Sequence, residues 1–296
     1  MATVEDQFEK MLIDKLNYLV DKNKNTGEAG GLLNAFQLAN RFESFQKVGK
    51  QNGLIFYVPA WNTSKIDPGT GFVDLLKPKY ENITKTKEFI EKFDSIRFTG
   101  GKNYFEFSFD YKNFTEKAEG SKTKWIVCTT NEDRYVWNKT LNNNKGGQER
   151  YDATERLKAL FDANQLEYKN GIDLKPQILK LDSADFFRGL MKALSVTLAI
   201  RYNNGEKGER ELDYILSPVA DSNGCFFDSR KADGSMPQNA DANGAYNTAL
   251  KGLLLLERLR EHGVEAFEKS KKVDKDGKSQ WLPNKEWLQF KQAKVS

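Results

Sequence analysis

Apolar residues recur along this chain at two spacings, one typical of helices and one typical of strands. Residues three or four positions apart share one face of a helix with about 3.6 residues per turn. This spacing predicts helices over residues 8–19, 157–161, 186–198, 241–256 and 281–290. We expect the best patterned of them, 186–198, to stop at residues 201–205, where Asn and Gly favour a left-handed turn.

Alternating apolar and polar residues predict strands, because successive side chains of a strand point to opposite faces. The clearest alternation is that of Phe105, Phe107, Phe109 and Tyr111. Apolar runs predict further strands at residues 54–58 and 212–216, the second ending at Pro218. Asn223–Gly224 predicts a hairpin turn into residues 225–227. Helices and strands are therefore mixed along the chain.

The composition excludes several classes of protein and of site. The chain has 296 residues, of which 39% are hydrophobic and 12% aromatic, enough apolar material for a folded core. Its two cysteines, Cys128 and Cys225, and its one histidine, His262, fit neither a four-ligand Cys/His zinc site nor a disulfide framework. We interpret Cys128 as a core residue and His262 as a residue of a charged helix end.

The charge is mildly basic, with 46 Lys and Arg against 42 Asp and Glu. This balance permits a nucleic-acid partner without requiring one, because binding depends on where the cations gather. No apolar run approaches the ~20 residues of a membrane span, and residues 1–10 lack the pattern of a secretory signal. We therefore expect a cytoplasmic protein with no membrane partner.

Residues 237–252 combine one carboxylate with several small residues at the start of a predicted helix. Asp241 precedes Gly244, Ala245 and Ala249. An aspartate before a helix commonly caps it by accepting backbone N–H groups, and spacing alone favours this role. The small residues would instead let the helix approach a neighbouring sheet and hold Asp241 rigidly beside other carboxylates, as a Mg²⁺ site requires. Both interpretations stay open on spacing alone.

The run DANGAYN at residues 241–247 resembles the third RuvC motif of type V CRISPR effectors and their transposon-encoded relatives. Further runs are similar to one subfamily, the type V-A RNA-guided DNA endonucleases (Cas-twelve-a family), and extend over nearly the whole chain in the family's order. They are FEKMLIDKLNY (8–18), YVPA (57–60), TSKIDP (63–68), GFV (71–73), FEFSFDYKNF (105–114), LDYILSP (212–218) and FFDSR (226–230).

The resemblance implies an α/β fold in which an RNase H-like RuvC portion is interrupted by an inserted, mixed α/β Nuc domain. It assigns residues 1–60 to the end of the second RuvC segment, 61–236 to the Nuc domain and 237–296 to the third RuvC segment. We expect the RuvC portion to be incomplete, because the Asp and Glu that precede this region in the family are not in this sequence. The expected protein is thus the C-terminal part of such a nuclease, inactive alone.

The resemblance also implies a site. Asp241 matches the last of three carboxylates that bind two Mg²⁺ ions in the family, so a metal-binding and catalytic role is expected for it. Arg201 matches a Nuc-domain arginine near the scissile phosphate, and Asp213 matches a nearby polar position. Two metal ions about 3.5–4 Å apart would activate water and neutralise the phosphate charge. The flank departs from the family's Met-Arg-Asn-Ser, since this chain has Ile-Arg-Tyr-Asn at residues 200–203.

The implied partners are target DNA, a guide RNA held by N-terminal regions and the N-terminal portion of the effector, in prokaryotic antiviral defence. Nucleic-acid contacts are expected at Lys65, Lys112, Asn203 and Arg230. An alternative function is a module that binds single-stranded DNA or a partner protein without cutting. A third is a degenerate remnant that folds without activity.

Overall fold

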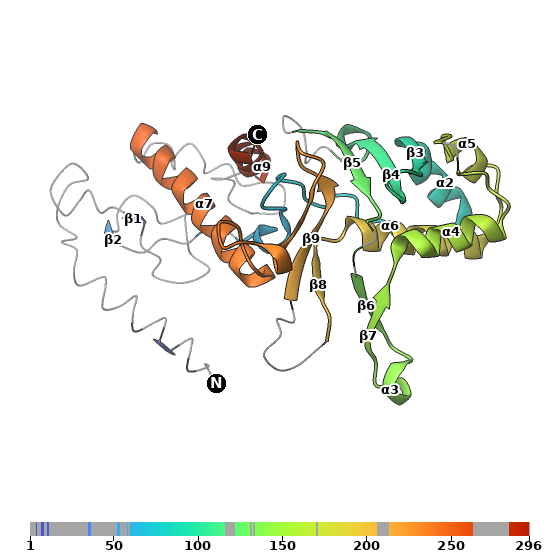
Figure 1. Cartoon of the computed structure of the whole chain (residues 1–296). Helices are drawn as coiled ribbons and strands as arrows, with labels where there is room; N and C mark the ends of the chain where they lie inside the picture. The colour runs from blue at the N-terminus through green and yellow to red at the C-terminus, as the bar shows by residue number, and fades with distance from the viewer. Residues whose placement is uncertain are drawn as a thin grey trace. The chain divides into compact units, whose positions relative to one another are not determined.

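Figure 1 shows the computed structural model of the chain. The structure describes residues 4, 7, 8, 11, 35–36, 52–53, 58, 60–115, 122–130, 132, 134–169, 171–205, 213–262 and 284–295. The chain divides into two compact units, of which one comprises Met1–Ala60 and Thr248–Pro283. The other, which we call the central unit, comprises Trp61–Asn247 and Asn284–Ser296. The boundaries of the RuvC segments and of the Nuc domain stay predictions.

Few residues of the first unit are described before Thr248. Strand β1 (Ala35–Phe36) pairs antiparallel with β2 (Asn52–Gly53). Phe8 and Met11 are helical, whereas most of the predicted helix at 8–19 lies outside the described residues. Of the predicted strand at 54–58 only Val58 is described, and it does not lie in a strand.

The central unit combines helices with small antiparallel sheets, which confirms the predicted mixture of the two classes. Its helices are α2 (Ile83–Glu91), α3 (Leu141–Asn144), α4 (Ala153–Ala163), α5 (Lys175–Ile178), α6 (Ala184–Leu198), α9 (Asn284–Val295) and the start of α7 (Ala240–His262). Its strands are β3 (Phe93–Thr99), β4 (Tyr104–Asp110), β5 (Lys124–Cys128), β6 (Arg134–Asn138), β7 (Gly147–Tyr151), β8 (Arg201–Asn203), β9 (Asp213–Ala220) and β10 (Phe226–Asp228). No described helix is long and apolar enough to cross a bilayer.

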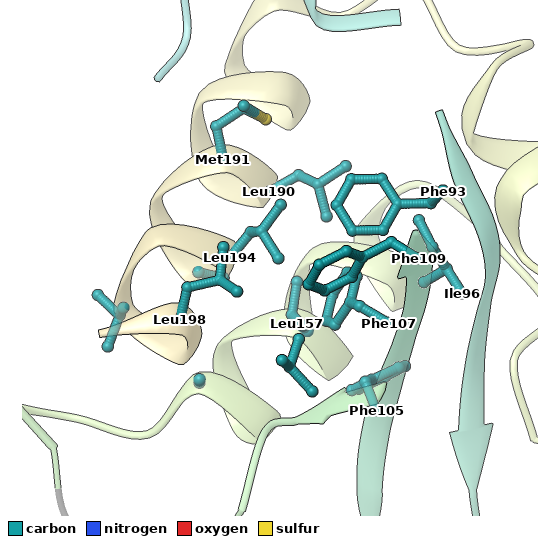
Figure 2. Close-up of a cluster of buried hydrophobic side chains, with 14 of the residues drawn as sticks. Phe93, Ile96, Phe105, Phe107, Phe109, Leu157, Leu190, Met191, Leu194 and Leu198 are labelled. Carbon is teal, nitrogen blue, oxygen red and sulfur yellow. The ribbon is translucent and has the colours of Figure 1, made fainter. Parts of the chain in front are cut away.

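A hydrophobic core lies between α6 and the sheet of strands β3, β4 and β5. The alternating phenylalanines of β4 are all fully buried, as their spacing predicts. Ser183 caps the start of helix α6, because its Oγ accepts the Phe186 N–H at 3.3 Å. In Figure 2, Leu190 and Leu194 of its apolar stripe point toward the phenylalanines, and Met191 and Leu198 belong to the same buried cluster. Burial of this stripe is the main stabilising contribution to the helix.

A second sheet, in the order β10-β9-β8, carries several of the predicted site residues. A buried carboxylate fixes its central strand, because Ser217 Oγ of β9 donates to Asp67 Oδ2. Asp67 also accepts the Gly69 N–H at 2.8 Å, and its burial raises the pKa of this carboxyl. The hairpin predicted at Asn223–Gly224 is present, with Asp221 N donating to Cys225 O at 2.8 Å.

Two boundaries differ from the predictions. Helix α6 ends at Leu198, the last residue of its predicted apolar stripe, and the expected stop at residues 201–205 is wrong because Ala199 already has an extended backbone. Strand β9 continues beyond Pro218 to Ala220. Proline lacks the N–H that a ladder needs. It is tolerated in β9 because it lies at the register shift of the β9–β10 pairing, between the pairs of Leu216 and Ala220.

Candidate functional site

Arg201, Asn203 and Asp213 lie on one face of the β8–β9 pair. The antiparallel register places Asn203 opposite Asp213 and Arg201 opposite Ile215, and side chains alternate along each strand. Asn203 Nδ2 donates to Asp213 Oδ1 at 2.9 Å, and Arg201 Nη2 donates to Asp213 Oδ2. Residues of β8 therefore hold both carboxylate oxygens of Asp213.

Tyr202 anchors β8 from the opposite face. Its ring is buried and stacks on Tyr214, with centroids 5.5 Å apart. Its Oη lies 2.5 Å from Val196 O and 2.8 Å from Ala199 O at the end of α6, and it accepts a hydrogen bond from Arg134 Nε at 3.2 Å. Burial raises the pKa of the Tyr202 phenol, so it remains a neutral donor. Since Tyr202 points inward, its neighbours Arg201 and Asn203 must point outward.

The first turns of α7 are fixed by three asparagines spaced four residues apart. Asn239 caps the helix, because its Oδ1 accepts the Ala242 N–H at 2.6 Å. Asn243 Nδ2 donates to Ile66 O at 2.9 Å, and Asn247 Nδ2 donates to Thr63 O at 2.8 Å. Both of these side chains are fully buried. The start of α7 is thereby held against residues 63–66.

Asp241 projects from this fixed turn and meets Arg201. Arg201 Nη2 lies 3.3 Å from Asp241 Oδ1, so one guanidinium nitrogen contacts the carboxylates of both Asp213 and Asp241. The side chains of Arg201, Asp213 and Asp241 are 36%, 26% and 84% exposed. A cation is thus held between two carboxylates that come from separate elements and are open to solvent.

Two expectations for residues 237–252 are corrected. Asp241 does not cap α7, because Asn239 fills that position. The predicted close approach to a sheet by Gly244, Ala245 and Ala249 is also wrong. Gly244 lies next to Ser64, in the short 3-10 turn at Thr63–Lys65, where an added Cβ would be 3.5 Å from the Ser64 Cβ, and Ala245 and Ala249 are not buried. Three asparagines, which the spacing 239, 243, 247 could have indicated, fix the helix instead, and two of them, Asn243 and Asn247, are buried.

The described residues do not by themselves form the ligand set of two Mg²⁺ ions. Among them, no three His, Cys, Asp or Glu side chains gather as metal ligands would. Asp241 is an exposed carboxylate, the donor type that Mg²⁺ prefers, and it fits the role of one ligand. Further carboxylates would be needed beside it.

The other predicted contact residues have different surroundings. Asn203 lies within the site but supports Asp213 directly. The Arg230 guanidinium lies 4.3 Å over the Tyr214 ring, and its Nε donates to Asp228 Oδ1 at 2.8 Å. Lys65 and Lys112 are exposed, and the described bonds of Arg201, Asp213 and Asp241 include neither.

One comparison with known families matches this region. Residues 66–231 match the family model NUC, described as a nuclease domain. The match contains Arg201 and Asp213 and ends before Asp241.

Proposed function

Because this chain belongs to the NUC nuclease domain family, we propose that Arg201, Asp213 and Asp241 form part of a site that cleaves phosphodiester bonds. The observation that carries this proposal is the shared guanidinium nitrogen, which contacts both carboxylates from β9 and α7. Such a cluster places a permanent cation, the half-buried carboxylate of Asp213 and the exposed carboxylate of Asp241 at one point on the surface. Phosphodiester cleavage uses a cation of this kind, because negative charge grows on the phosphate in the transition state. The carboxylates would contribute by binding a divalent cation.

Arg201 would bind the phosphate. A guanidinium can donate two parallel hydrogen bonds to phosphate oxygens and keeps its charge at any working pH. Asn203 holds the Asp213 carboxylate in one orientation, and that carboxylate in turn orients Arg201. Tyr202 fixes strand β8 behind them. The arrangement is therefore preorganised, which lowers the cost of positioning the donor during the reaction.

Asp241 would contribute one carboxylate to a divalent-cation site. Mg²⁺ would supply activation of water and neutralisation of phosphate charge. The remaining ligands would be carboxylates other than those described.

The resemblance to type V-A effectors supports a finer proposal. We propose that the substrate is DNA selected by a guide RNA in prokaryotic antiviral defence, and that cleavage requires the N-terminal portion of such an effector. The motifs that support it include residues 212–218 and 226–230, which contain Asp213 and Arg230. A chain that binds single strands and never cuts would instead support the binding module.

A cleavage assay with variants of Arg201 and Asp241 tests the proposal. The chain is incubated with labelled single-stranded and double-stranded DNA, alone and with the N-terminal portion of a type V-A effector and its guide RNA, in Mg²⁺ or EDTA. Cleavage is expected in the reaction that contains Mg²⁺, the N-terminal portion and its guide RNA. Arg201→Ala should reduce its rate about 100- to 1,000-fold, and Asp241→Asn should abolish it.

Asp185→Asn is the matched control for Asp241→Asn. Asp185 is exposed in the first turn of α6 and pairs with Arg188 at 2.9 Å. The Asp185→Asn variant should cleave at the wild-type rate. Cleavage that survives both Arg201→Ala and Asp241→Asn would overturn the proposed site.

A further inference from the structure

The β6–β7 hairpin presents an exposed tryptophan on a regular strand. The two strands pair from Arg134↔Tyr151 to Asn138↔Gly147, and α3 lies at the far end of the hairpin (Figure 1). Trp137 of β6 is 60% exposed. A large aromatic side chain costs solvation free energy when it is left in water, and exposed aromatic residues are enriched at binding surfaces.

The Trp137 ring is held by the turn that follows it. Gly146 has a φ of +80°, and a Cβ built on it would lie 2.4 Å from Trp137 Cζ2. The backbone of the turn is itself fixed, because Gly146 N donates to Leu141 O at 3.0 Å and Asn142 Nδ2 donates to Gly146 O at 3.0 Å. The indole therefore rests on the glycine backbone in a defined position while much of its surface faces solvent.

Polar and basic groups share the face of the hairpin that carries Trp137. Tyr135 lies two residues before Trp137, and the register places Arg150 opposite Tyr135 and Gln148 opposite Trp137. Directly opposed residues of an antiparallel pair project to the same side. We call these four residues the hairpin face: Tyr135, Trp137, Gln148 and Arg150. Exposed Lys139 and Lys145 lie near its outer end, in the turn that joins the strands.

The hairpin face adjoins the candidate site. The Gln148 side chain lies against Gly205, where a Cβ built on the glycine would be 3.0 Å from Gln148 Cγ. Gly205 N donates to Asn203 Oδ1 at 2.7 Å, and Asn203 in turn holds Asp213. A continuous set of contacts therefore runs from the partner of Trp137 to the site residues.

We propose that the hairpin face binds an unpaired base of a single-stranded nucleic acid by stacking on Trp137, beside the phosphate that Arg201 holds. This inference rests on the proposed function, since it assigns the form of the substrate. Every base has an aromatic face, and that face is accessible only when the base is unstacked and unpaired. The nearby cations Lys139, Lys145 and Arg150 favour a polyanion over an apolar protein surface.

Binding measured in EDTA tests the proposal apart from cleavage. The full chain is titrated with a labelled 15-nucleotide DNA, the same sequence as RNA, and the DNA duplex. Trp137→Ala should weaken single-strand binding roughly 5- to 150-fold, whereas Trp137→Phe should stay within about threefold because it keeps an aromatic face. Duplex binding should not change, and the tighter single strand identifies DNA or RNA as the ligand.

Tryptophan fluorescence supplies a readout that a purely structural role would not move. Stacking should quench the indole of Trp137, so the quenching that the oligonucleotide causes should be reduced in Trp137→Phe although this variant still binds. Ile172→Ala is the control, since Ile172 is an exposed apolar residue (44%) in the segment before α5. It should bind like the wild type.

The two proposals fail separately. Trp137-dependent binding and quenching without any cleavage would support the hairpin face and contradict the cleavage proposal. Single-strand binding by Trp137→Ala at wild-type affinity would overturn the hairpin face, even if cleavage occurs. Equal weakening of duplex binding would also overturn it, because a paired base cannot stack on the indole.

Discussion

Asn203 donates its side-chain amide to Asp213 directly across the β8–β9 pair, with 2.9 Å between Nδ2 and Oδ1. This bond fixes the carboxylate that Arg201 also contacts, so Asn203 acts as a positioning residue. Asn203→Ala should reduce the cleavage rate about tenfold, the effect of one lost hydrogen bond. Asn203→Asp should reduce it further, because it places two carboxylates opposite each other.

The pH profile separates positioning from general damage. In Asn203→Asp the new carboxylate should raise the apparent pKa of the acidic limb of the cleavage profile, because like charges disfavour ionisation. Asn223→Ala, at the exposed β9–β10 turn, is the control and should show the wild-type rate and profile. An Asn203→Asp profile that matches the wild type would contradict the assigned role.

Tyr202→Phe should destabilise the central unit. The change removes the hydroxyl that accepts from Arg134 Nε and lies at the α6 carbonyls, so a fully buried guanidinium loses a partner. An unsatisfied buried donor costs about 1–3 kcal/mol, and urea unfolding should show a decrease of this size in the free energy of unfolding. Tyr246→Phe removes a hydroxyl from a 41% exposed tyrosine and should change little. Equal stabilities of the two variants would show that the Tyr202 hydroxyl is dispensable.

The conformation of Gly146 can be tested against a matched glycine. Gly146→Ala should loosen the hairpin, since it strains a φ of +80° and drives a methyl group into the Trp137 ring. Gly224 has a φ of +79° with nothing within 4 Å of the position that a new methyl group would take, so Gly224→Ala carries the backbone strain alone. Amide hydrogen exchange in β6 and β7 should accelerate only in Gly146→Ala. Unchanged exchange there would mean that the ring does not rest on the glycine.

Local periodicity predicted the elements that build the core. Helix α6 and strand β4 were predictable because their apolar positions repeat every three to four or every two residues, and burial follows that repeat. Strand β8 was not predictable. It has three residues, and it exists because Tyr202 packs inward and β9 pairs with it.

The candidate site shows the same division. Family motifs indicated Arg201, Asp213 and Asp241, and the structure brings these three side chains together. The supporting bonds could not be predicted, because the contact of Asn203 with Asp213 depends on the pairing register of β8 and β9, and no local periodicity indicates strand β8. Their roles in catalysis stay predictions until the variants are assayed.

Lys291 of α9 should make the stability of the central unit depend on pH. Its Nζ lies 3.3 Å from Pro68 O and 4.8 Å from the Tyr246 ring centroid, with the Asp67 carboxylate nearby. Burial lowers the pKa of this ammonium from 10.5 to about 8, while the charge of Asp67 opposes the shift. Between these pH values the unfolded chain binds more protons than the folded chain, so this group makes the free energy of unfolding rise with pH.

Lys291→Met keeps most of the side chain and removes the titration. As the pH rises from 8 to 10.5, the free energy of unfolding of the wild type should increase relative to that of the variant by up to about 3 kcal/mol. Lys294→Met, an exposed lysine on the same helix, should give a curve parallel to the wild type. Parallel curves for Lys291→Met as well would show that this ammonium is solvated in the folded protein, and that α9 does not bury it against Pro68.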